Sequence, residues 1–178
     1  MMAIYLWINH REGIDHRLVI MPDHIPFWPH MTIPYLLMLF APWLGSLALK
    51  DQRSFYQYLI SITAIFMIIG GIWYFIPTEM TRPPTPEGML YQPHRDLVAH
   101  DAPTCIFPCG HVMGPITIIW LLAAENSRRL RWLIPLLIIG IIAVATTWQH
   151  RPIDILVGSL ISAAAIALTR KYFPQRSA

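Results

Sequence analysis

The chain has 178 residues, enough for one domain of ordinary size, and a formal net charge of +3. Hydrophobic residues make up 55% of it and charged residues only 13%, and its mean hydropathy is +0.47. So few charges exclude an ordinary water-soluble domain and favour an integral membrane protein. The basic residues cluster beside apolar runs, without interleaved aromatic residues, so no nucleic-acid partner is expected.

Residues 1–30 are mixed in character, and we expect them to form an interfacial N-terminal segment. The run 2–8 is apolar but too short to cross a bilayer, and it lacks the basic start of a signal peptide. Phe27 and Trp28 are typical aromatic anchors at the level of the lipid headgroups. The four histidines between residues 10 and 30 match no compact ligand spacing, so we expect surface histidines and no metal there.

Long apolar runs then dominate the chain, and each is close to the length that a bilayer requires. Continuous apolar runs in lipid must be helical, because unpaired backbone groups are not tolerated there. We therefore predict an all-α, polytopic membrane bundle over residues 31–169. The first run contains Pro34 and Pro42, which should kink it. A polar, proline-rich loop is expected at 78–110, between the second and third of the five runs, which are 32–49, 56–77, 111–127, 131–149 and 153–168.

The charges divide the exposed segments into two sets. Segments 50–55 and 126–131 and the tail 170–178 are basic, whereas segments 1–31, 78–110 and 150–152 together hold more acidic residues than basic ones. The positive-inside rule places the basic set, including the C-terminal tail, in the cytoplasm. The other set then faces the periplasm, the cell exterior or an organelle lumen, and all eight histidines fall on that side.

Three polar clusters, which contain Arg82, His111 and His150 respectively, are expected to meet on this outward face. Thirty-nine residues separate His111 from His150, or about 58 Å of helix. That is roughly two crossings of a ~30 Å hydrocarbon core, so a helical hairpin returns His150 to the level of His111. Arg82 follows the second apolar run, and its permanently charged fork suits phosphate oxygens. Each cluster taken alone also has a purely structural explanation. Arg82 could be an interfacial anchor, His111 could lie in a helix-capping turn, and His150 could mark an ordinary turn between two helices.

The residue types in these clusters suit phosphoryl transfer, which depends on positioning and charge neutralisation. His111 opens a helix, where free amides attract anions, and it can protonate a leaving oxygen. If the last run starts helical near Pro152, Asp154 lies one turn from His150 and reaches a ring nitrogen. His150 is then an oriented nucleophile, with Asp154 holding its tautomer.

These motifs resemble those of the type 2 phosphatidic acid phosphatase superfamily. The matching residues are Arg82-Pro83, Phe107-Pro-Cys-Gly-His111 and His150-x-x-x-Asp154, in the same order and around two spans. The resemblance covers roughly residues 56–169 and implies a metal-independent, cofactor-free membrane enzyme acting on lipid phosphates. It implies that His150 forms a phosphohistidine with the assistance of Asp154, and that His111 protonates the leaving group. The residues expected to hold the phosphate are Arg82, Cys109, Gly110 and, because it is adjacent to His150, Arg151.

The chain also departs from the usual motifs of that superfamily. Phe75 stands where the first motif has a lysine, Cys109 replaces the serine before Gly-His, and Ala143-Val144 replace Ser-Arg in the third motif. This reduced pattern is more similar to the branch of inositol phosphorylceramide and sphingomyelin synthases, as is Ile25-Pro-Phe-Trp-Pro. Members typically have six spans, and two explanations for the absence of the first remain open: the run 2–8 is its remnant, or the start codon has been placed too late.

Three hypotheses follow from the sequence. The first is an outward-facing lipid phosphate phosphatase, whose partners are its lipid substrate and the membrane lipids. The second is a lipid phosphotransferase that passes a phosphorylated head group to an alcohol. The third is a non-catalytic membrane protein on the same scaffold. The missing motif residues favour the second or the third over a typical phosphatase, whereas the presence of both histidines, the aspartate and one arginine favours catalysis. Cys105 and Cys109 lie on the oxidising side, where a disulfide can form, but their spacing in a proline-containing turn leads us to favour two thiols.

Overall fold

The computed structural model describes residues 1–12, 18–20, 25–47, 49–125 and 127–174. These residues are mostly helical, with a single pair of three-residue strands among them. Parts of the predicted interfacial segment (13–17 and 21–24) and of the predicted tail (175–178) lie outside the described residues. The helices are Met2–Asn9 (α1), Thr32–Ser46 (α2), Gln52–Phe75 (α3), Gln92–His100 (α4), Met113–Ala124 (α5), Leu130–Thr146 (α6) and Pro152–Tyr172 (α7).

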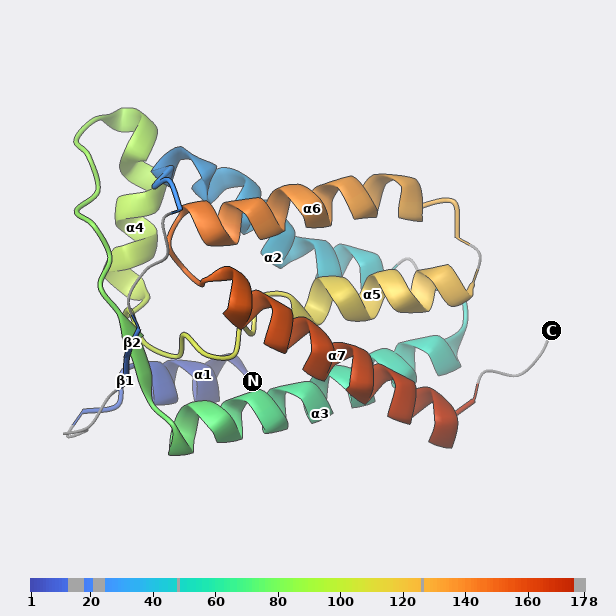
Figure 1. Ribbon diagram of the computed structural model, residues 1–178. Helices are drawn as coiled ribbons and strands as arrows, with labels where there is room; N and C mark the ends of the chain where they lie inside the picture. Colours follow the sequence, from blue (N-terminus) through green and yellow to red (C-terminus); the bar gives the residue numbers. More distant parts are fainter. Residues whose placement is uncertain (13–17, 21–24, 48, 126, 175–178) are drawn as a thin grey trace.

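Each of the five predicted apolar runs is a helix, and together they form one bundle (Figure 1). Helix α2 packs against α5 and α6, α3 packs against α5 and α7, and α5 also contacts α7. Two of these helices, α3 and α7, are long and apolar enough to cross a membrane. Helices α5 and α6 are apolar but shorter. Pro42 lies inside α2, whereas Pro34 falls in its first turn, where proline is tolerated.

The bundle buries its apolar side chains in several clusters. Ile65, Ile69 and Trp73 of α3 pack with Ala165 of α7 in one cluster. Met38 of α2 packs with residues of α6 in another. The outer surfaces of the helices are also apolar, with large exposed side chains that include Phe40, Trp43, Met67, Ile138 and Leu160. A soluble monomer rarely exposes so many large apolar groups, so these surfaces are suited to an apolar surrounding.

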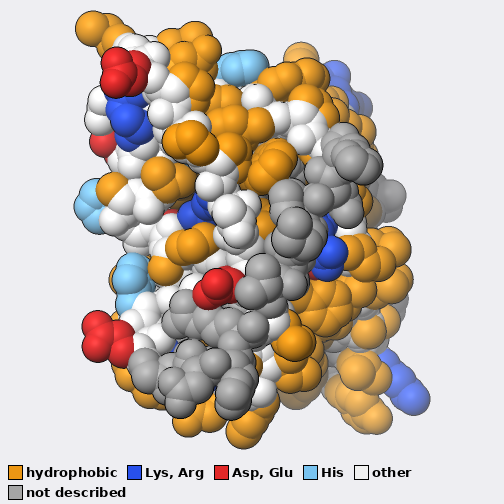
Figure 2. Space-filling model, turned by 60° about the vertical axis from the view of Figure 1, so that its left-hand side comes forward, with side chains coloured by type: hydrophobic (Ala, Val, Ile, Leu, Met, Phe, Trp, Pro, Cys, Tyr) orange, Lys and Arg blue, Asp and Glu red, His pale blue; other side chains and the backbone are white. Residues whose placement is uncertain are grey.

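The polar connections lie at the two ends of the bundle (Figure 1). One end carries α1, α4, the strands and the segments before α5 and α7, and the opposite end carries the start of α3 and the turn region between α5 and α6. Figure 2 brings the first end forward and shows histidine, acidic and basic side chains among hydrophobic ones on its described part. The segments that bear His111 and His150 are therefore at the same end, as the helical-hairpin argument predicted.

The segment 78–110 is more ordered than the predicted loop. It contains strand β2 (Thr78–Met80), a 3-10 turn (Met89–Tyr91) and helix α4. Strand β2 pairs in parallel with β1 (Leu18–Ile20), a pairing that the sequence analysis missed. Pro93, the second residue of α4, suits the first turn of a helix, where an amide has no partner within the helix. The apolar run 2–8 forms α1, and Ile8 joins the core cluster of α3.

Candidate active site

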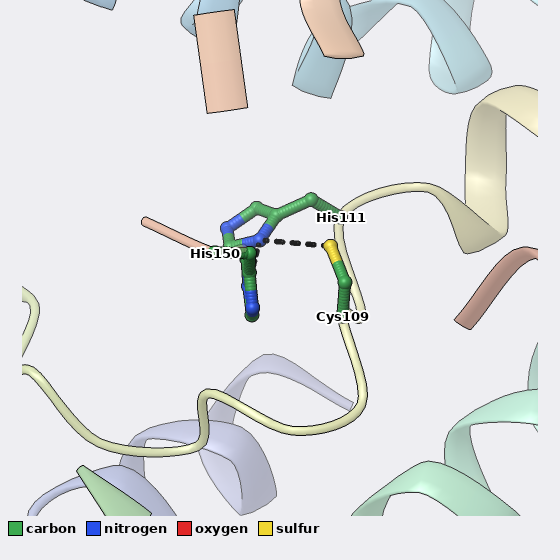
Figure 3. A group of neighbouring side chains, drawn as sticks. All are labelled: Cys109, His111 and His150. Atoms are coloured by element: carbon green, nitrogen blue, oxygen red, sulfur yellow. Dashed lines mark hydrogen bonds between the residues drawn. The ribbon is translucent and has the colours of Figure 1, made fainter. Parts of the chain in front are cut away.

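The imidazole rings of His111 and His150 are in direct contact. Nε2 of His150 lies 2.7 Å from Nδ1 of His111, and the ring centroids are 4.7 Å apart. His111 lies in the turn before α5, and His150 lies between α6 and α7. Figure 3 shows the two rings meeting, with the sulfur of Cys109 beside them. The predicted meeting of these two histidines is confirmed.

The second ring nitrogen of His150 is held by the backbone. Nδ1 of His150 lies 2.5 Å from the carbonyl oxygen of Ile106, which only accepts hydrogen bonds. Nδ1 therefore carries the proton and donates it to Ile106, and Nε2 keeps its lone pair. The side chain of His150 is only 3% exposed. A carbonyl group thus fixes the tautomer, the task that the sequence analysis assigned to Asp154.

Asp154 is placed differently from the prediction because His150 is not part of helix α7. Arg151 precedes Pro152 and has an extended backbone (φ −85°, ψ 162°), so α7 begins only at Pro152. A residue before proline is disfavoured in the helical region for steric reasons. The carboxylate of Asp154 accepts hydrogen bonds from the backbone N–H of Arg151 (2.8 Å) and from its guanidinium (3.3 Å), which caps the helix. Arg151 therefore pairs with Asp154.

His111 is held on its other side by Tyr35 of α2. The hydroxyl of Tyr35 lies 2.7 Å from Nε2 of His111. Since Nε2 of His150 has no proton, the contact between the rings requires the proton on Nδ1 of His111. Nε2 of His111 then accepts from the Tyr35 hydroxyl. The result is a directed chain of hydrogen bonds that runs from Tyr35 through both rings to the carbonyl of Ile106.

Arg82 lies beside the histidines in a buried polar network. Its guanidinium donates to the backbone carbonyl of Asp101 (2.7 Å), to the Asp101 carboxylate (2.9 Å) and to Oε1 of Gln149 (2.9 Å), the residue before His150. Tyr5 of α1 donates to the other carboxylate oxygen of Asp101 at 2.5 Å. All three predicted clusters therefore meet, and Asp101 and Gln149 join them.

Two buried donors of this network have no acceptor within the described part of the chain. They are Nε of Arg82 and the side-chain nitrogen of Gln149. A buried donor without a partner costs about 1–3 kcal/mol, and in a native protein such a group calls for an explanation. An anion placed between Arg82 and the histidines would supply the missing acceptors.

Cys109 and Gly110 are placed by close packing. The backbone N–H of Cys109 donates to the carbonyl of Asp154 (2.9 Å), and a Cβ atom on Gly110 would lie 2.6 Å from the indole of Trp73. The Trp73 ring therefore occupies the space that a side chain at position 110 would need. The Cys109 sulfur is 3.9 Å from Nδ1 of His111. Cys105 and Cys109 are not bonded to each other.

Burial controls the protonation of the site. Burial lowers the pKa of His111 to about 4, with the Asp101 carboxylate opposing this shift and the Arg82 guanidinium adding to it. Burial, His111 and Arg82 hold the pKa of His150 well below its usual value, against the hydrogen bond to Ile106. Burial raises the pKa of the Cys109 thiol to about 12. Both rings and the thiol are therefore uncharged at neutral pH.

Comparisons with protein-family models, with curated proteins and with solved structures found no match for this chain. The function has to be argued from the chemistry of the site. That site consists of a buried histidine pair with a defined tautomer, an arginine with an unused donor, and a thiol. Four of its members, Tyr35, Asp101, Ile106 and Gln149, are absent from the predicted set.

Proposed function

We propose that the protein is a membrane-embedded, metal-independent phosphatase of lipid phosphates that works through a phosphohistidine. The observation that carries the proposal is the contact between Nε2 of His150 and Nδ1 of His111, together with the carbonyl of Ile106 on the opposite nitrogen of His150. This arrangement leaves the lone pair of one imidazole directed at the proton of another. A nucleophile and a general acid need this relationship when a phosphoryl group lies between them.

The reaction follows from the geometry. A phosphate ester enters between the rings, and the lone pair on Nε2 of His150 attacks phosphorus. His111 first takes up a second proton with the phosphate anion, so that both of its nitrogens are protonated. The N–P bond then forms while the bond from phosphorus to the lipid oxygen breaks, and Nδ1 of His111 gives that oxygen its proton, which leaves a neutral ring. The proton on Nδ1 of His150 stays on its hydrogen bond to Ile106. Water then attacks phosphorus, the N–P bond breaks, and His111 takes up a proton from that water.

Arg82 supplies the positive charge that phosphoryl transfer requires. Its Nε and the side-chain nitrogen of Gln149 are two of the buried donors without acceptors near His150. Two hydrogen bonds from them to phosphoryl oxygens would satisfy both groups and offset the developing charge. A phosphate anion beside His111 also raises the pKa of that ring, because opposite charge favours the protonated form. Substrate binding thus prepares the acid.

The surroundings of the site support a lipid phosphate as the substrate. The histidine pair lies at one end of a bundle whose helices expose large apolar side chains. We place five spans in the bilayer (α2, α3, α5, α6 and α7), with the histidine end outward and the basic connections in the cytoplasm. A phosphate at that end, with its lipid tail along the bundle, meets both the polar and the apolar requirements.

A transferase is the second candidate, and the burial of the nucleophile favours it. The side chain of His150 is 3% exposed, so bulk water has little access to a phosphohistidine formed there. An alcohol bound with the donor lipid would then take the phosphorylated group. The sequence departures at Phe75, Ala143 and Val144 point in the same direction, because they remove phosphate contacts that are common among the phosphatases.

The test is phosphate release by the detergent-purified protein from a panel of lipid monophosphates and diphosphates. We expect release that is abolished in His150→Ala and kept in His30→Ala, which removes an exposed histidine. Candidate alcohols, added in parallel, distinguish the two activities, since a transferase forms a new phospholipid in place of free phosphate. If neither free phosphate nor a new phospholipid forms with any lipid, the result favours the non-catalytic hypothesis.

A further inference from the structure

The histidine pair has a third neighbour that phosphoryl transfer does not need. One ligand atom each from Cys109, His111 and His150 lies within 4.8 Å of the other two (Figure 3). A buried thiol beside two imidazoles is the donor set that zinc and other borderline divalent metals prefer. We propose that these three side chains form a binding site for Zn²⁺, and that the bound ion switches off the histidine pair.

The distances suit a tetrahedral ion. Bond lengths of about 2.05 Å to nitrogen and 2.3 Å to sulfur place tetrahedral ligands roughly 3.3 Å apart for two nitrogens and roughly 3.6 Å apart for nitrogen and sulfur. The corresponding separations are 2.7 Å between the two imidazole nitrogens and 3.9 Å between the Cys109 sulfur and His111. The third pair, the Cys109 sulfur and the ligand nitrogen of His150, lies within 4.8 Å. Side-chain movements of about an ångström open the ring contact and shorten the sulfur contacts.

The outer nitrogens of both rings already have the partners that metal-bound histidines require. A ligating histidine almost always donates its other N–H to an oxygen, which fixes the tautomer and the ring orientation. Nδ1 of His150 lies 2.5 Å from the carbonyl of Ile106, and Nε2 of His111 lies 2.7 Å from the hydroxyl of Tyr35. Both supporting oxygens are therefore in place on the sides that face away from the sulfur.

The proton balance of binding is simple. The Cys109 thiol loses its proton to solvent as the sulfur–zinc bond forms. The proton of His111 moves by exchange from Nδ1 to Nε2, where it is donated to the oxygen of Tyr35. His150 binds through the Nε2 lone pair without a change of tautomer. One thiolate and two neutral imidazoles leave a fourth position for water or a phosphate oxygen.

The nearby charges allow such a site. Arg82 faces both rings and opposes a cation, but its guanidinium is paired with the Asp101 carboxylate at 2.9 Å. The Asp154 carboxylate lies near the thiol of Cys109. The two carboxylates near the site therefore balance the two arginines, since Arg82 is paired with Asp101 and Arg151 is paired with Asp154. A divalent ion bound to one thiolate adds a single net charge.

The expected inhibition of phosphate release by Zn²⁺ rests on the proposed function. The binding of Zn²⁺ to the three side chains does not depend on that function. Zinc uses the same lone pair of His150 that attacks phosphorus. The ion and the substrate phosphate are therefore alternatives at that nitrogen. We expect Zn²⁺ to inhibit phosphate release and a chelator to restore it, with no metal needed for activity.

Co²⁺ is the probe for binding, since its spectrum reports both the ligands and the geometry. The full-length protein in detergent is treated with a chelator, dialysed and titrated with Co²⁺. We expect a thiolate-to-cobalt charge-transfer band and intense tetrahedral visible bands, both displaced by Zn²⁺. Cys109→Ser should lose the charge-transfer band, and the matched Cys105→Ser should keep it. Tyr35→Phe should weaken binding about 10- to 100-fold.

Weak octahedral bands alone in the wild type would overturn the proposal, as would an unchanged charge-transfer band in Cys109→Ser. If Cys109→Ser does not fold, X-ray absorption of the zinc-loaded wild type decides. One sulfur and two imidazoles around zinc support the site, and oxygen ligands alone refute it. These readouts are independent of turnover. Missing cobalt bands leave the phosphatase proposal intact, and missing phosphate release leaves the metal site intact.

Discussion

Nδ1 of His150 lies 2.5 Å from the carbonyl oxygen of Ile106, a backbone group 44 residues earlier in the chain. This bond sets the tautomer of the buried ring without a carboxylate. A backbone carbonyl does not titrate, so the lone pair on Nε2 of His150 is available over a wide pH range. The position of the loop before α5 thus decides the chemistry of the residue before α7.

We predict that Asp154 acts mainly on stability. Asp154→Ala removes the acceptor for the buried N–H of Arg151 and should lower the free energy of unfolding by about 1–3 kcal/mol. Below its melting temperature the variant should lose less than tenfold in turnover, because Ile106 still holds His150. Thermal unfolding in detergent and phosphate release check both points. A loss of turnover as complete as in His150→Ala, at unchanged stability, would contradict this role.

Arg82 should be sensitive even to a change that keeps its charge. Lysine lacks the guanidinium fork, so Arg82→Lys cannot keep the contacts with Asp101 and Gln149 and still reach a phosphate. Losing one charge-assisted hydrogen bond costs about 1.5–3 kcal/mol, or roughly 10- to 150-fold in kcat/KM. Arg95→Lys is the matched control, since Arg95 lies in α4 at the same end and is only partly buried. Equal losses in both variants would rule out a specific role for Arg82.

Gly158 of α7 should be essential for the position of the site loop. A Cβ atom there would lie 2.1 Å from the carbonyl oxygen of Cys109, a backbone atom that cannot turn away. Gly158→Ala should therefore lower both the melting temperature and the phosphate release. Gly71→Ala in α3 is the control, because nothing lies within 4 Å of its Cβ position, and it should stabilise by up to about 1 kcal/mol. The reverse order of stability would refute the close contact between α7 and the loop.

The stability of the protein should fall in acid, partly because of His94. This buried ring of α4 contacts Thr85 (2.7 Å) and Phe27, and its pKa is lowered from 6.5, chiefly by burial. The unfolded chain therefore binds the proton more tightly, so stability is full above about pH 6.5 and decreases as the pH falls toward the lowered value. His94→Gln should show a smaller drop in melting temperature between about pH 7.5 and about pH 5.5. Identical drops would contradict the contribution of His94.

The sequence predicted the helical bundle because long apolar runs have few alternatives to a helix. The boundaries of α3 and α6 lie within a few residues of the predicted ones. Helix α4 was missed because its sequence, Gln92 to His100, is polar and proline-containing, which is typical of a loop. The parallel pairing of β1 with β2 joins residues 60 apart, and no local pattern indicates such a contact.

The candidate site was predictable only in part for the same reason. His111, His150 and Arg82 were found because their residue types and spacing carry a chemical signal. Tyr35, Ile106 and Asp101 carry none, since a tyrosine in an apolar run, a backbone carbonyl and a loop aspartate are ordinary. The predicted pairing of Asp154 with His150 was wrong because Pro152 keeps Arg151 extended, which places His150 outside α7.

The most direct test of the account is to find the phosphate on His150. The protein is mixed with a lipid phosphate labelled with radioactive phosphorus, quenched in alkali and digested, because a phosphohistidine survives base and is lost in acid. We predict label on the peptide that contains His150, acid-labile, absent from His150→Ala and present in His30→Ala. Phosphate release or lipid transfer without any label on that peptide, at every quench time, would contradict the account.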